Sequence, residues 1–311
     1  MKKILLLVFS FFILGCREEL PEYKAIPNIT QITYHKGLDI TPDIFDDGKW
    51  LAFSSNKMGN FDIYIKDVNS RDMIQRTQAK EDELFPSFSP DGKIAFSSNL
   101  FGSFDIFIMD GFSHGPIQQV TFDNASDEIS PDFSPDGTKI VFSKIINNRA
   151  IICLLDLQTG LTTELTEGLF PKFSPKGNKI VYQRKIEEKK QAVWTLDLNS
   201  KLSTEIVSYD ELSSLSPSWS PDGRRIVYIL GKKENGLFKY KKLIPQLKDY
   251  TPIDIRIINI NGTEEIRLTN DRGPDGFPIW SNDNYIYFSS LRQSKDELDV
   301  NIFRLNFDGL P

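Results

Sequence analysis

The sequence has few of the residue types that many enzymes use at their reacting centres. Its 311 residues include two histidines, His35 and His114, and two cysteines, Cys16 and Cys153. It contains neither a Gly-x-Ser-x-Gly nucleophile pattern nor a His-Glu-x-x-His zinc pattern. These absences argue against a Ser-His-Asp triad, a histidine-rich metal centre and a disulfide framework. Both histidines lie in polar, turn-like segments, so we interpret them as exposed loop residues.

The N-terminal apolar run is too short to cross a membrane. Ile4–Leu14 has 11 residues after a basic start, whereas a spanning helix needs about 20. The segment from Ile13 to Cys16 resembles the bacterial lipobox, which implies that residues 1–15 are a signal peptide and that Cys16 becomes the lipidated N-terminus. An ordinary signal peptide with an incidental cysteine is the alternative.

Residues 16–27 follow as the acylated cysteine and a polar, proline-containing tether. The residue after Cys16 is Arg rather than Asp, so the retention signal of the enterobacterial inner membrane is absent. We therefore expect an anchor in the outer membrane of a bacterial envelope, on its periplasmic or its surface side. Cys153 lies in the apolar run Ile151–Leu155 and is predicted to be a small buried hydrophobic residue.

One pattern recurs through the rest of the chain, residues 28–311. A proline opens each copy and a turn residue follows six places later, with a strand-like run after it. The prolines are Pro42, Pro86, Pro131, Pro171, Pro217 and Pro278, and the turn residues are Gly48, Gly92, Gly137, Gly177, Gly223 and Asn284. Successive prolines are 44, 45, 40, 46 and 61 residues apart, which is the period of a propeller blade of about 40–45 residues with one insertion.

The strand order predicts how the ring closes. Short segments ending in Thr or Ser precede each copy and would be the outermost strands. The first, Ile29–Thr33, has no blade ahead of it, and the last copy, ending near Asn306, lacks a fourth strand. We therefore predict an all-β, six-bladed β-propeller in which the N-terminal strand completes the C-terminal blade, and almost no helix.

The repeats also resemble a known family. Ser89-Pro90-Asp91-Gly92, a β run and then Phe104-Asp105-Ile106-Phe107 are similar to the WD-like repeats of the TolB propeller. The likeness covers about residues 28–309 and implies the propeller fold. TolB has an α/β domain ahead of its propeller, whereas here the propeller follows the tether directly.

Four acidic residues occupy one position of the repeat, three places before the opening proline. They are Asp39, Glu83, Glu128 and Asp275, and Gly168 and Ser214 replace them in the other copies. In a closed ring these acids come from adjacent blades, so we expect an acidic crescent at one mouth of the channel. The loops of the fourth and fifth copies on that face are basic, which would polarise its charge.

An insertion between Gly231 and Asp254 mixes aromatic and basic side chains. Its candidate binding residues are Lys232, Lys233, Phe238, Tyr240, Lys241 and Lys242. It is interpreted either as a flap that docks on a partner or an anionic surface, or as a long loop packed on its own blade.

These features predict a lipid-anchored, non-catalytic scaffold that binds envelope proteins through one face. The acids could instead begin turns, or they could hold Ca²⁺, and otherwise no cofactor is expected. The alternative function is an enzyme or a binder of saccharides or cell-wall fragments that uses carboxylates at the channel mouth. A net charge of −6 gives no reason to expect nucleic acid.

Overall fold

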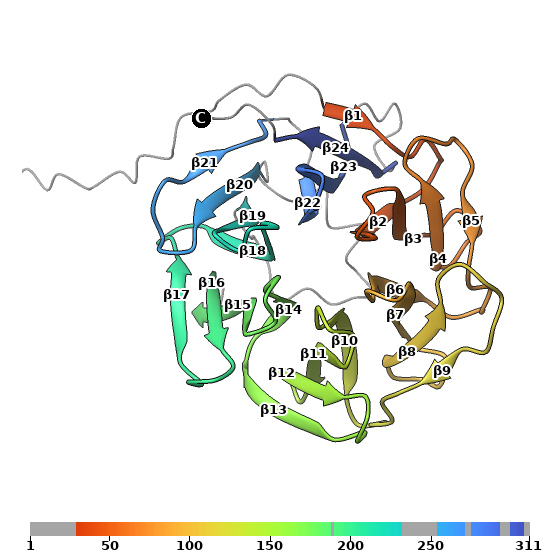
Figure 1. The fold of residues 1–311 in the computed structure, drawn as a ribbon, viewed down its shortest axis with the longest axis horizontal. Coiled ribbons are helices and arrows are strands. Elements are labelled where there is room, and N and C mark those ends of the chain that lie inside the picture. Colours follow the sequence, from red (N-terminus) through yellow and green to blue (C-terminus); the bar gives the residue numbers. More distant parts are fainter. Residues whose placement is uncertain (1–28, 188–189, 232–253, 271–274, 293–298, 308–311) are drawn as a thin grey trace, which may run out of the picture.

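The structure, a computed structural model, describes residues 29–187, 190–231, 254–270, 275–292 and 299–307. Every regular element in this part of the chain is a strand, and the strands form six four-stranded antiparallel sheets around one axis (Figure 1). The predicted all-β, six-bladed propeller is confirmed. No helix among the described residues is long and apolar enough to cross a membrane.

The strands run from the axis outward in each blade. Blade 1 contains β2 (Asp39–Ile44), β3 (Trp50–Ser55), β4 (Asp62–Asp67) and β5 (Ile74–Gln75). Blade 2 contains β6 (Glu83–Phe88), β7 (Lys93–Ser98), β8 (Asp105–Asp110) and β9 (Gln118–Gln119). Blade 3 contains β10 (Asp127–Phe133), β11 (Lys139–Ile146), β12 (Arg149–Asp156) and β13 (Thr162–Glu167).

The second half of the ring repeats this order. Blade 4 contains β14 (Leu169–Phe173), β15 (Lys179–Glu187), β16 (Lys190–Asp197) and β17 (Ser203–Val207). Blade 5 contains β18 (Ser213–Trp219), β19 (Arg225–Gly231), β20 (Asp254–Asn259) and β21 (Ile266–Arg267). Blade 6 contains β22 (Asp275–Trp280), β23 (Tyr285–Ser290), β24 (Asn301–Asn306) and, outermost, β1 (Ile29–Gln31).

The first strand closes the ring as predicted. In β1, Ile29 lies opposite Leu305 and Gln31 lies opposite Phe303 of β24. The pairing continues past the strand, where the Ile32 amide donates to the Ile302 carbonyl at 2.8 Å. Figure 1 shows the red β1 beside the dark blue β24, so the two ends of the described chain share one sheet.

The repeated turns form for a local reason. In blade 2 the Ser89 hydroxyl accepts a hydrogen bond from the Lys93 amide at 2.8 Å, and Gly92 takes a φ of 84°. Glycine adopts this left-handed conformation without strain, and asparagine is among the other residues that tolerate it. Asn284 does so in blade 6 with a φ of 62°. These turns define the turn face of the ring, and the hairpins between second and third strands define the opposite hairpin face.

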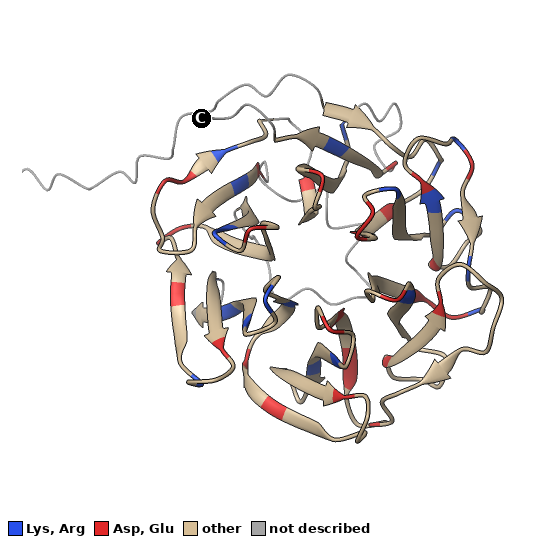
Figure 2. Ribbon diagram, viewed as in Figure 1, with Lys and Arg blue, Asp and Glu red and all other residues tan. Residues whose placement is uncertain are grey.

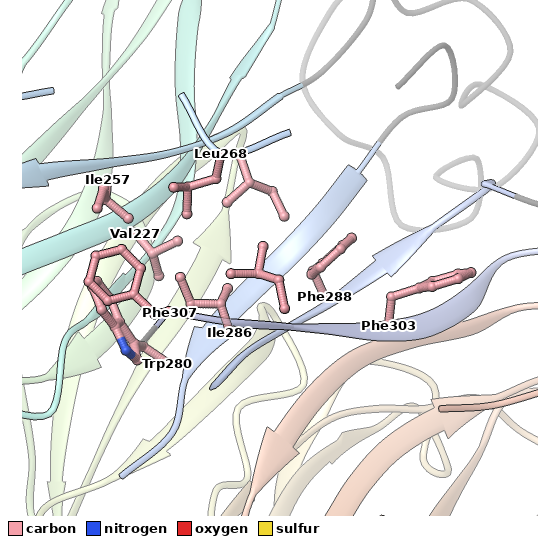
Figure 3. Close-up of a cluster of buried hydrophobic side chains, with 10 residues drawn as sticks. Val227, Ile257, Leu268, Trp280, Ile286, Phe288, Phe303 and Phe307 are labelled. Atoms are coloured by element: carbon pink, nitrogen blue, oxygen red, sulfur yellow. The ribbon is translucent and has the colours of Figure 1, made fainter. Parts of the chain in front are cut away.

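Hydrophobic side chains fill the seam between each pair of neighbouring blades. Figure 3 shows the seam between blades 5 and 6, where Val227, Ile257 and Leu268 lie near Trp280 and Ile286. Six such clusters join the blades, and a seventh lies toward the axis on the hairpin side. The inner strands are therefore fixed from both sides, which positions their polar residues firmly.

Candidate binding face and axial cavity

The four repeated acids lie in the seams between blades. Asp39, Glu83, Glu128 and Asp275 stand at the starts of the inner strands, toward the hairpin face. Their exposed fractions are between 1% and 4%. The acidic crescent expected from the sequence is therefore buried, and its carboxylates do not form an exposed mouth. The physical reason is that each acid faces polar groups of the preceding blade.

A threonine two places after the preceding outer strand is one of those groups. The hydroxyls of Thr33, Thr77, Thr121 and Thr269 accept hydrogen bonds from third-strand amides at 2.8–2.9 Å. The same hydroxyls lie near the acid of the next blade and lower its pKa. Each threonine thus connects a third strand to the following inner strand, which locks neighbouring blades together.

The third strand carries a matching residue in each seam. One position of each third strand pairs with the second-strand residue two places after the repeated aromatic, and it carries Asp62, Asp105, Ile151, Ala192, Asp254 and Asn301. In the same order, the repeated position of the following blade carries Glu83, Glu128, Gly168, Ser214, Asp275 and Asp39. Where this position has no acid, at Gly168 and Ser214, the third-strand residue is apolar. The other four combinations of a third-strand residue with an acid are called the seam pairs.

The seam pairs avoid unpaired buried charge in different ways. Arg292 donates to both oxygens of Asp275 at 2.9–3.0 Å, and Arg267 donates to Asp254 at 2.9 Å. Asp39 faces a seam that carries neutral Asn301 instead of a second acid. Glu83 lies near Asp62, and Glu128 lies near Asp105, and in each pair the charge of the aspartate raises the pKa of the glutamate. Like charges this close favour a state in which one of the two carboxyl groups is protonated.

Burial sets the protonation of these acids. It raises the pKa of Glu83 to about 7, and the charge of Asp62 raises it as well. Burial raises the pKa of Glu128 to about 7 in the same way, with Asp105 adding to the effect. The pKa of Asp39 is raised by burial to about 6. These acids are therefore partly protonated near neutral pH.

Two cavities open beside the seams toward the hairpin face. The first, in blade 2, has a volume of about 270 Å³ and is lined by Glu83, Phe96, Leu100, Phe101 and Ile117, among others. Phe101 is 63% exposed and Leu100 is 42% exposed at its rim. Together with Met58, 68% exposed on the neighbouring hairpin, they form the apolar rim of the hairpin face.

The second cavity, which we call the Gly168 pocket, lies between blades 3 and 4 and is basic. It has a volume of about 230 Å³, and its charged lining residues are Arg149, Glu167, Arg184 and Lys185. Figure 2 shows blue segments on β15, the strand that contributes Arg184 and Lys185 to this lining. The hairpin face therefore combines an apolar cavity with a basic one.

Three phenylalanines block the axis of the ring. Phe85, Phe170 and Phe277 come from alternate blades, and their ring centroids are 5.8–6.2 Å apart. The space beside them is about 40 Å³, roughly the volume of one water molecule. The three rings therefore lie in contact with one another at the axis.

The turn-face end of the axis widens into a polar cavity of about 350 Å³. Lys172 donates to Asp132 at 2.9 Å and lies 4.0 Å from Asp43. Burial raises the pKa of Asp43 to about 6, and the charge of Lys172 opposes this shift. Sequence reasoning missed this triad. All three residues directly follow an opening proline, so the same repeat alignment contained the signal.

The other predicted site residues cannot be placed. Cys16 and the six candidate residues of the insertion, from Lys232 to Lys242, lie outside the described residues. Within the described ranges, no group of three or more His, Cys, Asp or Glu residues is arranged to hold a metal ion. Binding by the sequence-predicted residues stays a prediction.

Comparison with known proteins gives a family and a fold. Residues 25–211 match the family described as TolB beta propeller domain. A putative TolB from Agrobacterium tumefaciens is similar in structure, with a TM-score of 0.66 and 18% identity over 90% of this chain and 96% of that one. TolB from Acinetobacter baumannii has a TM-score of 0.59 and 17% identity, covering 84% of this chain and 64% of that one.

An enzyme shares the fold as well. The oligogalacturonate lyase of Vibrio parahaemolyticus has a TM-score of 0.59 and 14% identity over 92% of this chain and 96% of that one. No curated protein matches the sequence. Because these identities are low, the likenesses to solved structures establish architecture and leave the chemistry to be argued from the residues.

Proposed function

Since the chain belongs to the TolB beta-propeller family, we propose that it is a non-catalytic scaffold that binds a protein partner of the bacterial envelope. The binding surface would be the hairpin face. One observation carries this proposal, the combination on that face of an exposed apolar rim with one apolar and one basic cavity. Exposed apolar side chains next to charged pockets are typical of protein interaction sites.

The proposed location follows from the sequence. Cys16 would be acylated after removal of residues 1–15, and residues 17–27 would hold the propeller away from an outer membrane. The membrane contact would be the lipid anchor, and the basic, aromatic insertion after Gly231 would add to the partner surface. The proposed role requires no cofactor.

The apolar rim gives a direct test. The double variant Met58→Asp/Phe101→Asp should reduce crosslinked capture of the envelope partner at least about 10-fold, because it places charge in the apolar contact. The measurement is quantitative mass spectrometry of the captured partner.

Leu161→Asp/Leu202→Asp is the matched control, because both leucines are 69% exposed and lie in turns on the turn face. It should leave capture unchanged. Equal capture by both double variants would contradict binding through the hairpin face.

The axial cavity favours a second candidate, a saccharide or cell-wall-fragment site. Asp43, whose pKa is raised to about 6, lies beside the ion-paired Asp132 and Lys172, the combination that acid–base chemistry needs. Binding of acidic and neutral oligosaccharides to the full chain, compared with Asp43→Asn and with Asp91→Asn on an exposed turn, tests this candidate. Binding that Asp43→Asn abolishes, together with conversion of the bound sugar, would replace the scaffold proposal.

A further inference from the structure

The Gly168 pocket occupies one of the two seams where the repeated acid is missing. A Cβ atom on Gly168 would lie 2.5 Å from the Tyr182 ring and 2.9 Å from Ile152, so no carboxylate can be accommodated at this position. The partner position on the third strand is Ile151. This seam therefore lacks the negative charge that its counterparts in blades 1, 2, 3 and 6 contain.

The Gln183 side chain lies on the other side of its sheet from this pocket. Its Oε1 atom accepts a hydrogen bond from the Ser216 amide of β18 in blade 5 at 2.9 Å. Gln183 borders the pocket with its main chain, since its carbonyl oxygen would lie 3.0 Å from a Cβ atom on Gly168. The charge of the pocket therefore comes from its other side chains.

The charged groups around the pocket have the complementary sign. Its described lining contains three cations, Arg149, Arg184 and Lys185, and one carboxylate, Glu167. The Arg184 guanidinium lies 5.1 Å from the centre of the Trp194 ring, which holds it in place. Arg149 donates to Glu167 at 2.8 Å, but both side chains are more than half exposed, so this ion pair can exchange partners.

We propose that the Gly168 pocket binds the carboxylate of an aspartate or glutamate side chain of the partner. That the carboxylate belongs to a protein partner rests on the proposed function, in which the partner binds the hairpin face where this pocket opens. A carboxylate can accept two parallel hydrogen bonds from a guanidinium, and the pocket is lined by two, those of Arg149 and Arg184. The cavity of about 230 Å³ admits a single side chain of this size.

The experiment uses the full chain and two small probes, acetyl-glutamate methylamide and its neutral counterpart acetyl-glutamine methylamide. Titration is followed by NMR at the Nε–H groups of Arg149 and Arg184. The glutamate probe should shift both signals and the glutamine probe neither. Arg184→Gln should weaken binding about 10-fold or more, since a charge-assisted hydrogen bond is removed.

Arg149→Gln, on an exposed hairpin, is a second variant that should weaken binding without disturbing the fold. Lys176→Gln is the matched control, because it removes one positive charge from an exposed turn on the other face. Equal shifts with both probes, or equal losses in Arg184→Gln and Lys176→Gln, would overturn the carboxylate site.

The partner assignment can fail separately. If free acetate binds as tightly as the glutamate probe and Arg184→Gln leaves partner capture unchanged, the site serves free carboxylic acids and the partner assignment is overturned. If the probe fails but Met58→Asp/Phe101→Asp still abolishes capture, the scaffold function stands without this pocket. If the glutamate probe binds but Met58→Asp/Phe101→Asp leaves partner capture unchanged, the carboxylate site stands and the proposed function fails.

Discussion

At the scale of single residues, the raised pKa of the buried Glu83 makes stability depend on pH. The pKa of Glu83 is about 7 in the folded chain against an ordinary 4.5. Between these values the folded state binds more protons than the unfolded state. The free energy of unfolding therefore falls as pH rises from about 4.5 to about 7 and stays low above that. The pKa of Glu128 is also raised by burial, so its contribution to the free energy of unfolding falls with rising pH in the same way.

Glu83→Gln should remove part of this dependence. The amide can donate to Asp62 at any pH and cannot ionise, so the variant should be more stable than the natural chain at pH 8 by about 1–3 kcal/mol. At pH 5 the two should differ little. Urea unfolding of both chains at the two pH values measures the difference.

The control is Glu211→Gln, because Glu211 is exposed. It should change stability by less than about 0.5 kcal/mol at either pH. A Glu83→Gln variant that is destabilised equally at pH 5 and pH 8 would show that the pKa of this carboxyl group is not raised.

At the scale of elements, each inner strand bends just before its proline. Thr41, Phe85, Ser130, Phe170, Ser216 and Phe277 all have φ between 47° and 57°. The residue before proline normally prefers an extended conformation, and a left-handed one is uncommon outside glycine. The ladder shifts register at the same place in all six blades. These bulges aim the three phenylalanines at the axis.

The closing strand β1 offers a prediction at this scale. Ile32, which follows β1, is 3% exposed in the seam between blades 6 and 1. Ile32→Ala should cost about 2–5 kcal/mol and should lower hydrogen-exchange protection of the β24 amides more than that of β8.

Ile74→Ala is the control, because Ile74 lies on an outer strand and is 47% exposed. It should cost less than about 1 kcal/mol. Uniform loss of protection across all blades in Ile32→Ala would show that β1 does not close blade 6 as a separate element.

Elements were predictable from the sequence because each repeat contains its own turn chemistry. Proline, glycine and aromatic spacing placed the strands to within a few residues, and counting outer strands predicted the closure. The bulges were not predictable, since local rules favour an extended residue before proline. Burial of Glu83 and its fellow acids was missed as well, because it depends on the third strand of the neighbouring blade. Spacing along one chain does not show which side chains face each other.

At the scale of the whole molecule, the ring is held by seams rather than by covalent crosslinks. The described part of the chain contains one free cysteine, Cys153, which is 0% exposed in the seam between blades 2 and 3. Burial raises the pKa of its thiol to about 12, so it is unreactive near neutral pH. The other cysteine of the sequence, Cys16, is the proposed site of acylation.

The two cysteines should therefore respond to the same substitution in opposite ways. Cys16→Ser should abolish acylation and release the chain from the membrane fraction, and it should leave the free energy of unfolding of the propeller unchanged, because residue 16 precedes the first strand. Cys153→Ser should keep the acyl group and cost about 1–3 kcal/mol, because it buries a hydroxyl in an apolar seam. Intact mass, membrane fractionation and urea unfolding of both variants measure these effects. A Cys16→Ser chain that keeps its acyl mass, or stays with the membrane as firmly as the natural chain, would contradict the lipid anchor and leave the propeller to reach its partner without one.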